Sequence, residues 1–338
     1  MNLKEEKYSR YALVREMMET PSIIRTFKPD VATAFAQRIK ACKGLFLTGE
    51  GSSRIFPAKR AISRSLQTSF GMPVVTEGCT QALDYNLSSF AVFAASNSGQ
   101  TKEVVRLLTA LRNAGHSAIF GLTANGGTKL CELAGDTHVL LCGKEDAVAA
   151  TKSVVEQALF YDSLLRVLHG VKMDGLAELA AQFGEALTAG IDPAITNTIK
   201  KARTVYFAGR NNGVAEELAL KTNEITRKKS DFLEGTFALH GIEEVMDKDD
   251  ALIWIDPFDS EQEQFDKRLA KGAGINVIAI SAKPTMFPTA VIPDAGEYAE
   301  YVQLAAGWNI LVETGLATSI NLDKPERARK VGNEYSEQ

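Results

Sequence analysis

The sequence predicts an α/β protein with two three-layer domains in tandem, each built on a parallel sheet with helices on both faces. Strands alternate with helices of about three turns, an order that requires crossover connections and gives a doubly wound sheet. The order of elements in the first half recurs in the second half, at an offset close to half of the 338 residues. The repeat indicates a duplicated domain.

Two pairs of segments carry the repeat. Residues 44–62 (GLFLTGEGSSRIFPAKRAI) predict a strand, a glycine turn and a helix, and residues 204–220 (TVYFAGRNNGVAEELAL) predict the same order. Residues 90–124 then predict a strand, a polar loop, a helix and a strand. Residues 250–282 predict the same order of elements. The predicted strands are continuously apolar, which is typical of parallel strands covered on both faces.

Helical patterns at residues 151–168 and 173–189 connect the two halves, with breaks at Gly170 and at Ile191-Asp192-Pro193. Two domains agree with a usual size of roughly 100–200 residues each. We therefore expect a helical lead-in over residues 1–30, a first domain over 31–170, a second domain over 190–325 and a tail over 326–338.

Composition excludes several classes of protein. The formal net charge is −4 and neither half is strongly basic, so we expect no nucleic-acid or anionic-membrane partner. No apolar run approaches the ~20 residues that span a bilayer, and the first residues lack a signal peptide's apolar core. The four cysteines (Cys42, Cys79, Cys131 and Cys142) are far apart in sequence. This spacing predicts reduced thiols in a cytoplasmic protein, with no metal site and no cofactor.

The segment ASNSGQT at residues 95–101 is the most informative one. It follows the apolar run at residues 90–94 and precedes an amphipathic helix. Its backbone N–H groups and hydroxyls converge at the positive end of that helix, an arrangement that holds phosphate or another compact anion. Ordinary helix capping would give a similar pattern, because Ser and Thr are common N-caps.

Further hydroxyls follow other strands of the first half. One loop contains Ser52 and Ser53, the next contains Ser96, Asn97, Ser98 and Thr101, and a third helix opens at Thr151. Ligands of such sheets lie beyond the carboxyl ends of the strands, where these loops meet. Three hydroxyl-rich helix starts on one edge favour an anion site over capping alone. The corresponding loop of the second half, residues 256–261, carries carboxylates that would repel phosphate.

The second half instead concentrates ionisable groups. Glu217, Lys221 and Glu224 are spaced by four and three residues, so they share one face of a helix. A solvated stripe of ion pairs would have the same spacing. His240 stands within the apolar stretch FALHG, where a lone histidine is more often structural than catalytic.

The ordered set SNSGQT, ATKS, ALKTNEIT and HG closely resembles the sugar-isomerase (SIS) family. It resembles in particular the isomerase half of glucosamine-6-phosphate synthase and its stand-alone deaminase and deglycase relatives, over residues 11–330. The resemblance implies two flavodoxin-like domains in a homodimer that binds a sugar phosphate. The residues do not decide whether His240 acts in its own chain or across the dimer interface.

The resemblance also implies roles for individual residues. The phosphate would be held by Ser53, Ser96, Asn97, Ser98 and Thr101, with Ser52 beside them, and the sugar would be lined by Val148, Ala149 and Thr151. Glu224 would move the proton between sugar carbons, Lys221 would stand one turn before it, His240 would open the ring, and Lys330 of the tail would reach into the site. A carboxylate suits proton transfer between neighbouring carbons, and histidine exchanges protons near neutral pH.

Three departures from the family pattern leave the substrate open. Glu50 replaces a small uncharged residue, Gln100 replaces the usual glutamate, and Leu239 and Ile242 flank His240-Gly241 in place of Lys and Pro. The expected reaction is that of a glucosamine-6-phosphate deaminase, with fructosamine-6-phosphate deglycase and simple aldose–ketose isomerase as alternatives. A non-catalytic phosphosugar sensor is a further alternative. No N-terminal Cys nucleophile is present, so glutamine-dependent transfer is not expected.

Overall fold

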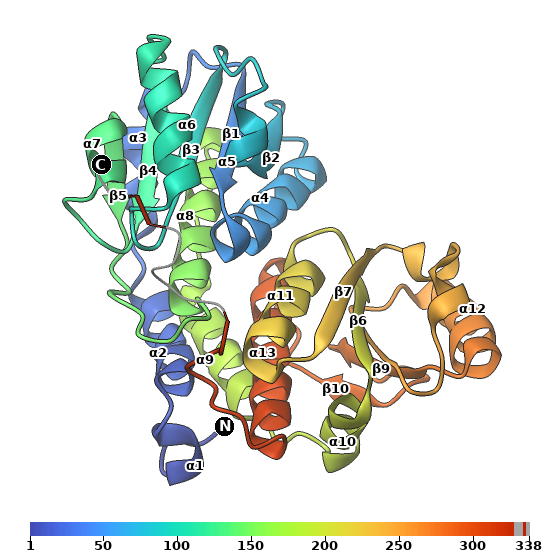
Figure 1. Ribbon diagram of the computed structural model, residues 1–338. Coiled ribbons are helices and arrows are strands. Elements are labelled where there is room, and N and C mark those ends of the chain that lie inside the picture. Colours follow the sequence, from blue (N-terminus) through green and yellow to red (C-terminus); the bar gives the residue numbers. More distant parts are fainter. Residues whose placement is uncertain (328–333, 336–338) are drawn as a thin grey trace. The chain divides into compact units, whose positions relative to one another are not determined.

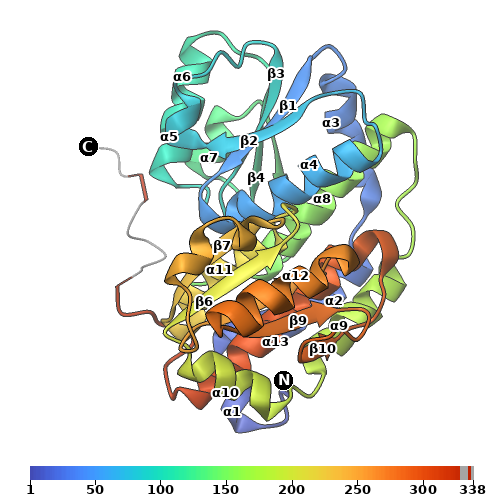
Figure 2. The same ribbon diagram turned by 90° about the vertical axis from the view of Figure 1, so that its right-hand side faces the viewer.

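A computed structural model of the chain describes residues 1–327, 334 and 335 (Figures 1 and 2). It contains two five-stranded sheets, with strand orders β2-β1-β3-β4-β5 and β10-β9-β8-β6-β7, and all their strand pairs are parallel. Within each half, the second strand lies at one edge, followed by the first, third, fourth and fifth. This is the order of flavodoxin-like sheets, so the predicted tandem α/β fold is confirmed.

One compact unit comprises residues 22–145 and 150–176 together with Glu334 and Tyr335. Its strands are β1 (Gly44–Gly49), β2 (Val74–Gly78), β3 (Phe90–Ala95), β4 (Ile119–Thr123) and β5 (Asp136–Val139). Its helices are the short η1 (Pro29–Ala32) and η2 (Gly51–Ser53), then α3 (Thr33–Arg38), α4 (Ile55–Gln67), α5 (Cys79–Ala82), α6 (Lys102–Asn113), α7 (Lys129–Leu133) and α8 (Lys152–His169). The long helices α4, α6 and α8 follow the predicted positions.

Alternate residues of β3 divide the core of this unit between two faces. Val92 and Ala94 pack with side chains of α5, α6 and α7 on one face. Phe93 points to the other face, where its ring stacks on Phe120 at 4.8 Å between centroids. Phe160 of α8 and Phe35 of α3 complete this second cluster, with their rings edge to face at 5.3 Å. The period of two in a strand thus supplies both layers of the core.

The other compact unit comprises residues 1–21, 146–149 and 177–327 of the described chain. Its strands are β6 (Thr204–Gly209), β7 (Lys229–Glu234), β8 (Ala251–Ile255), β9 (Asn276–Ser281) and β10 (Thr289–Val291). Its helices are α1 (Glu6–Ser9), the first part of α2 (Ala12–Thr26), α9 (Leu176–Thr188), α10 (Pro193–Lys201), α11 (Val214–Thr226), α12 (Gln262–Phe265) with its π-helical continuation η6 (Asp266–Ala273), and α13 (Ala299–Ala317). Short turns η3 (Phe237–Leu239), η4 (Ile242–Val245), η5 (Asp259–Glu261) and η7 (Gly296–Tyr298) connect them.

The sheet of this unit also has two different faces (Figure 1). Trp254 of β8 stacks on Phe265 of α12, with 3.6 Å between ring centroids. Leu239, at the end of η3, belongs to the same cluster, so η3 and α12 cover one face. Helices α11 and α13 cover the opposite face, and Gly307 of α13 allows close packing because a Cβ there would lie 2.3 Å from Leu218.

Some elements have no clear signal in the sequence. The strands at the sheet edges, β2, β5, β7 and β10, are short or carry polar residues. Helix α13 is buried on nearly all sides and therefore lacks an amphipathic pattern. Among the described residues, no helix is both long enough and apolar enough to cross a membrane.

We expect Phe93→Ala to destabilise the first unit by about 3–5 kcal/mol, because it removes a fully buried ring from a cluster of four aromatic side chains. Urea unfolding followed by circular dichroism measures this change. Phe237→Ala is the matched control, since that ring is 48% exposed. Equal losses of stability in the two variants would contradict this description of the core.

Candidate functional site

The strand order of the first sheet brings two polar loops together at one edge. The order reverses between β1 and β3, and ligands of such sheets bind beyond the carboxyl ends of the strands at that point. The loop after β1 contains Ser52 and Ser53, and the loop after β3 contains residues 96–101. A Cβ on Gly49 would lie 2.8 Å from the carbonyl oxygen of Ala95. Glycine is therefore needed where the two strand ends approach.

Three predicted hydroxyls form one cluster in the loop before α6, which we call the anion loop (residues 96–101). The Ser96 Oγ lies 2.8 Å from the Thr101 Oγ1 and 3.5 Å from the Ser98 Oγ. The backbone N–H of Gly99 donates to the Ser96 Oγ at 3.0 Å, and that of Gln100 donates to the Ser98 Oγ at 3.2 Å. Ser96 is buried, whereas Ser98 and Thr101 are half-buried. The cluster stands at the positive end of α6, where an anion is favoured.

Gly99 fixes the shape of the anion loop. Its φ is +68°, in the left-handed region, and a Cβ there would lie 2.1 Å from the Thr128 Oγ1. Its carbonyl oxygen accepts a hydrogen bond from the Leu130 N–H at the start of α7. The loop is therefore held by backbone contacts that only glycine permits.

The third predicted helix start is arranged differently. The backbone N–H and the hydroxyl of Thr151 both donate to the Glu145 Oε1, at 2.7 Å and 3.2 Å. Thr151 is fully buried, and a carboxylate already occupies the positive end of α8. The role of Thr151 in ligand binding stays a prediction, and in this structure its N–H and hydroxyl are engaged by a side chain of the protein.

Four further predicted residues of the first half are Ser52, Ser53, Val148 and Ala149. Ser52 is buried in η2, and the Ser53 carbonyl oxygen accepts a hydrogen bond from the Gln157 side chain. Val148 and Ala149 belong to the short stretch 146–149 of the other unit. The Val148 N–H donates to the Asp323 carbonyl oxygen at 3.4 Å, and Ala149 is buried.

Glu50 has a structural contact. Its Oε1 accepts the backbone N–H of Cys79 at 2.9 Å, at the start of α5. Burial raises the pKa of Glu50, while the hydrogen bond from Cys79 opposes that rise. The side chain thus ties the loop after β1 to the end of β2.

In the other unit, Lys221 lies between two carboxylates on α11. Its Nζ is 2.7 Å from the Glu224 Oε2 and 3.2 Å from the Glu217 Oε1. Lys221 and Glu217 are fully buried, whereas the Glu224 side chain is 22% exposed. Burial lowers the pKa of Lys221, but the attraction of Glu224 and Glu217 outweighs it and raises this pKa above its usual value. The alternative of a solvated ion-pair stripe is therefore wrong.

His240 follows η3 in the same unit. It is exposed in the turn between η3 and η4, directly after Leu239. Leu239 packs in the cluster on the α12 face, and α11 with Glu224 covers the opposite face. The segment that precedes His240 and the helix that carries Glu224 therefore cover opposite faces of the second sheet.

The described part of the tail lies on the anion loop. Glu334 forms an antiparallel bridge with Thr101, and the Tyr335 N–H donates to the Gln100 carbonyl oxygen at 2.7 Å. Lys330, which the resemblance assigns to the site, lies outside the described residues.

The second sheet carries an ion pair at its point of strand reversal, between β6 and β8. The Arg210 Nε lies 2.6 Å from the Asp256 Oδ2, and the Arg210 guanidinium lies 4.2 Å from the centre of the Phe258 ring. The two halves thus share strand order and differ in what their loops hold. Among residues 1–327, 334 and 335, no group of three or more His, Cys, Asp or Glu could hold a metal ion.

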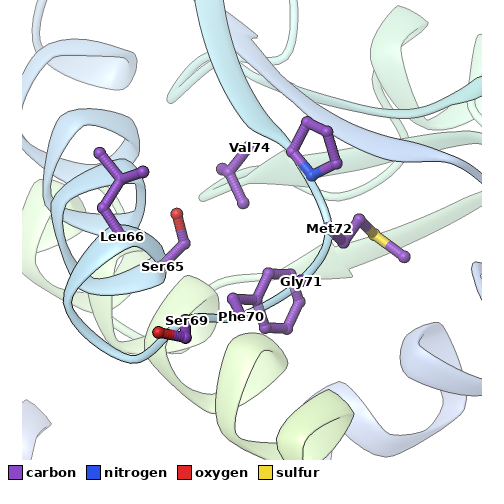
Figure 3. A pocket seen from close by; sticks show the side chains of 8 residues that line it. Ser65, Leu66, Ser69, Phe70, Gly71, Met72 and Val74 are labelled. Atoms are coloured by element: carbon purple, nitrogen blue, oxygen red, sulfur yellow. The ribbon is translucent and has the colours of Figure 1, made fainter.

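A hollow of about 540 Å³ lies elsewhere in the first unit (Figure 3). It is lined by Ser65, Leu66, Ser69, Phe70, Gly71, Met72, Pro73 and Val74. These residues run from the end of α4 to the first residue of β2, at the edge of the sheet opposite the carboxyl ends of the strands. None of the predicted site residues lines it.

No protein-family model and no curated protein matches the sequence. Solved structures do match. The C-terminal domain of glucosamine-fructose-6-phosphate aminotransferase from Francisella tularensis is 16% identical with a TM-score of 0.77, over 95% of this chain and 100% of that one. The chain has the tandem SIS fold.

Two further structures share this fold. Tagatose-6-phosphate ketose/aldose isomerase from Escherichia coli is 16% identical with a TM-score of 0.78, over 96% of this chain and 99% of that one. Glucosamine-6-phosphate deaminase from Thermotoga maritima is 19% identical with a TM-score of 0.75, over 96% and 99%. Identities this low show a shared fold, and they leave the substrate of this chain open.

We expect Ser98→Ala combined with Thr101→Ala to weaken phosphate binding by about tenfold or more, because two hydrogen bonds to a charged group are lost. Calorimetry with inorganic phosphate measures the change. Thr109→Ala is the control. Thr109 lies on α6, and its hydroxyl donates to the Val105 carbonyl oxygen within that helix, away from the anion loop. Unchanged binding in a folded double variant would show that the anion loop is not the phosphate site.

Proposed function

We propose that the protein is a phosphosugar isomerase that acts on an aminosugar or ketose 6-phosphate, with glucosamine-6-phosphate deamination as the first candidate reaction. The observation that carries this proposal is the cluster of Ser96, Ser98 and Thr101 hydroxyls at the start of α6. It stands at the strand reversal of the first sheet, where compact anions bind in this class of fold. A phosphate held there anchors the substrate and supplies binding energy for orientation.

The charged group on α11 supports the proton-transfer part of the proposal. Glu217 and Glu224 carry two negative charges and Lys221 one positive charge, so the group retains one negative charge in its ionised form. Glu224 is the exposed member, which makes it the carboxylate that a substrate could reach. It would take a proton from one sugar carbon and return it to the next. The Lys221 ammonium, 2.7 Å away, would stabilise the negative charge that develops.

His240 would open the sugar ring, as the family resemblance implies. Because η3, which precedes His240, and α11, which carries Glu224, cover opposite faces of the second sheet, we propose that His240 serves a second copy of the chain. Its exposed position in the turn after η3 is compatible with contact to another subunit. The proposal therefore includes a homodimer with shared active sites.

Solved structures with this fold include a deaminase and a ketose/aldose isomerase, so both reactions remain candidates alongside fructosamine-6-phosphate cleavage. A panel of sugar 6-phosphates, assayed for ammonia and ketose together, distinguishes them. We expect turnover of at least one amino- or keto-sugar 6-phosphate and none of the unphosphorylated sugars. Binding of sugar phosphates without turnover of any would instead support a sensor.

We expect Glu224→Gln to lower turnover by roughly two to four orders of magnitude, because the amide keeps the shape of the side chain and loses the proton acceptor. Exchange of the substrate C2 hydrogen with deuterated solvent measures the step directly. Glu185→Gln, at an exposed position of α9, is the control. Exchange at the wild-type rate in Glu224→Gln would exclude this residue as the base.

We expect a mixture of inactive Glu224→Gln and inactive His240→Asn chains to regain about a quarter of the wild-type activity. Half of randomly mixed dimers are heterodimers, and one of the two sites in each would contain both wild-type groups. Mass spectrometry first establishes that the subunits exchange. An absence of recovery after exchange would mean that His240 serves its own chain or takes no part in the reaction.

A further inference from the structure

We infer that Glu145 is a positioning residue that orients the anion loop for phosphate by linking Asn97 to the start of α8. The inference rests on the proposed function, because it requires that the anion loop binds a phosphate. Glu145 does not touch the hydroxyl cluster in any contact described above. It acts through Asn97, which stands between Ser96 and Ser98 in the sequence.

The Glu145 carboxylate is fully buried and accepts hydrogen bonds from two separate elements. Its Oε1 accepts the N–H and the hydroxyl of Thr151, at 2.7 Å and 3.2 Å, and the N–H of Ser153 at 3.5 Å. Its Oε2 accepts the Ser153 hydroxyl at 2.5 Å and the Asn97 Nδ2 at 2.9 Å. These donors offset the cost of burying the charge.

The carboxylate determines which way the Asn97 side chain faces. An ionised carboxylate only accepts hydrogen bonds, so the NH₂ end of the Asn97 amide has to point toward Glu145. The main chain of Asn97 is fixed separately, since its carbonyl oxygen accepts from the Asn125 Nδ2 at 2.8 Å and the Thr123 Oγ1 at 3.1 Å. Residue 97 is thus held at both its backbone and its side chain, and the serines on either side are held with it.

The same carboxylate directs the anion to α6. Helix α8 has 18 residues, and its N-terminus would otherwise attract an anion. With Glu145 bound to the N–H groups of Thr151 and Ser153, that positive end is occupied. The start of α6, by contrast, carries the Ser96, Ser98 and Thr101 hydroxyls.

Charge alone predicts the opposite effect of neutralising Glu145. A negative charge near the anion loop repels phosphate, so its removal would tighten binding if electrostatics dominated. A glutamine at this position has one acceptor oxygen and one NH₂ group, yet it faces donors from residues 97, 151 and 153. At least one of these contacts would break, and the anion loop would lose its fixed orientation. The sign of the change in affinity therefore separates the two effects.

The experiment measures binding of inorganic phosphate by calorimetry to the full chain and to Glu145→Gln. We expect the variant to bind about tenfold or more weakly, the usual effect of losing a hydrogen bond to a charged group. Glu156→Gln is the matched control. Glu156 is likewise a buried glutamate, although it lies within α8, and its oxygens accept the N–H groups of Leu141 and Cys142 at 2.8 Å and 2.7 Å. This control should lower the thermal stability and leave phosphate affinity unchanged.

A second pair of variants covers the case in which Glu145→Gln does not fold. Ser153→Ala removes the 2.5 Å hydrogen bond to Glu145 and should weaken phosphate binding about threefold to tenfold. Ser163→Ala, at another fully buried serine of α8, removes a hydrogen bond to the Pro29 carbonyl oxygen and should not change the affinity.

The outcomes separate this inference from the proposed function. If the wild-type chain binds neither inorganic phosphate nor any sugar 6-phosphate, the proposed function fails. If the wild-type chain binds phosphate and Glu145→Gln or Ser153→Ala binds it equally well or more tightly, the positioning role is overturned. Phosphate binding that is weakened equally in Glu145→Gln and Glu156→Gln, or in Ser153→Ala and Ser163→Ala, would overturn the positioning role as well. A general loss of stability would then explain the weaker binding.

Discussion

The reversal of strand order between β1 and β3 is the constraint on which the candidate site depends. Parallel strands joined by right-handed crossovers deliver their carboxyl ends to one edge, and the reversal separates the helices that follow β1 and β3. The loop with Ser52 and Ser53 and the anion loop both follow strands at this edge. Gly49 permits the close approach, because a larger residue would press on the Ala95 carbonyl oxygen.

Buried charges in both units are held by partners rather than by solvent. Glu145 is matched by amide, hydroxyl and backbone donors, and Lys221 is matched by two carboxylates. Arg60 of α4 pairs with Asp162 of α8, and both are almost fully buried. Removing one partner of such a group leaves an uncompensated charge, which costs more than the pair itself contributes. These positions therefore tolerate little change. Two of the three groups include predicted site residues: Glu145 binds Asn97 and Thr151, and Lys221 pairs with Glu224.

The two halves show how one topology can hold different chemistry. In the first, the loops after β1 and β3 carry hydroxyls at the positive end of α6. In the second, the equivalent loops carry the Arg210–Asp256 ion pair, and the ionisable groups lie further along the helix that follows β6. A guanidinium already paired with a carboxylate has less capacity to bind a free anion. The proposed division between anion binding in one half and proton transfer in the other rests on this difference.

The sequence by itself determined the central strands, the long crossover helices and the grouping of Ser96, Ser98 and Thr101, because each depends on residues close together in the chain. It did not predict the edge strands or the fully buried α13, whose patterns depend on neighbours. Only the tertiary structure decided that Glu145 engages Asn97, 48 residues away, and that η3 and α11 cover opposite faces of the second sheet. The local sequence shows the hydrophobic period of each helix or strand and the positions of its charges. The partner of a buried polar group depends instead on how distant segments of the chain pack together.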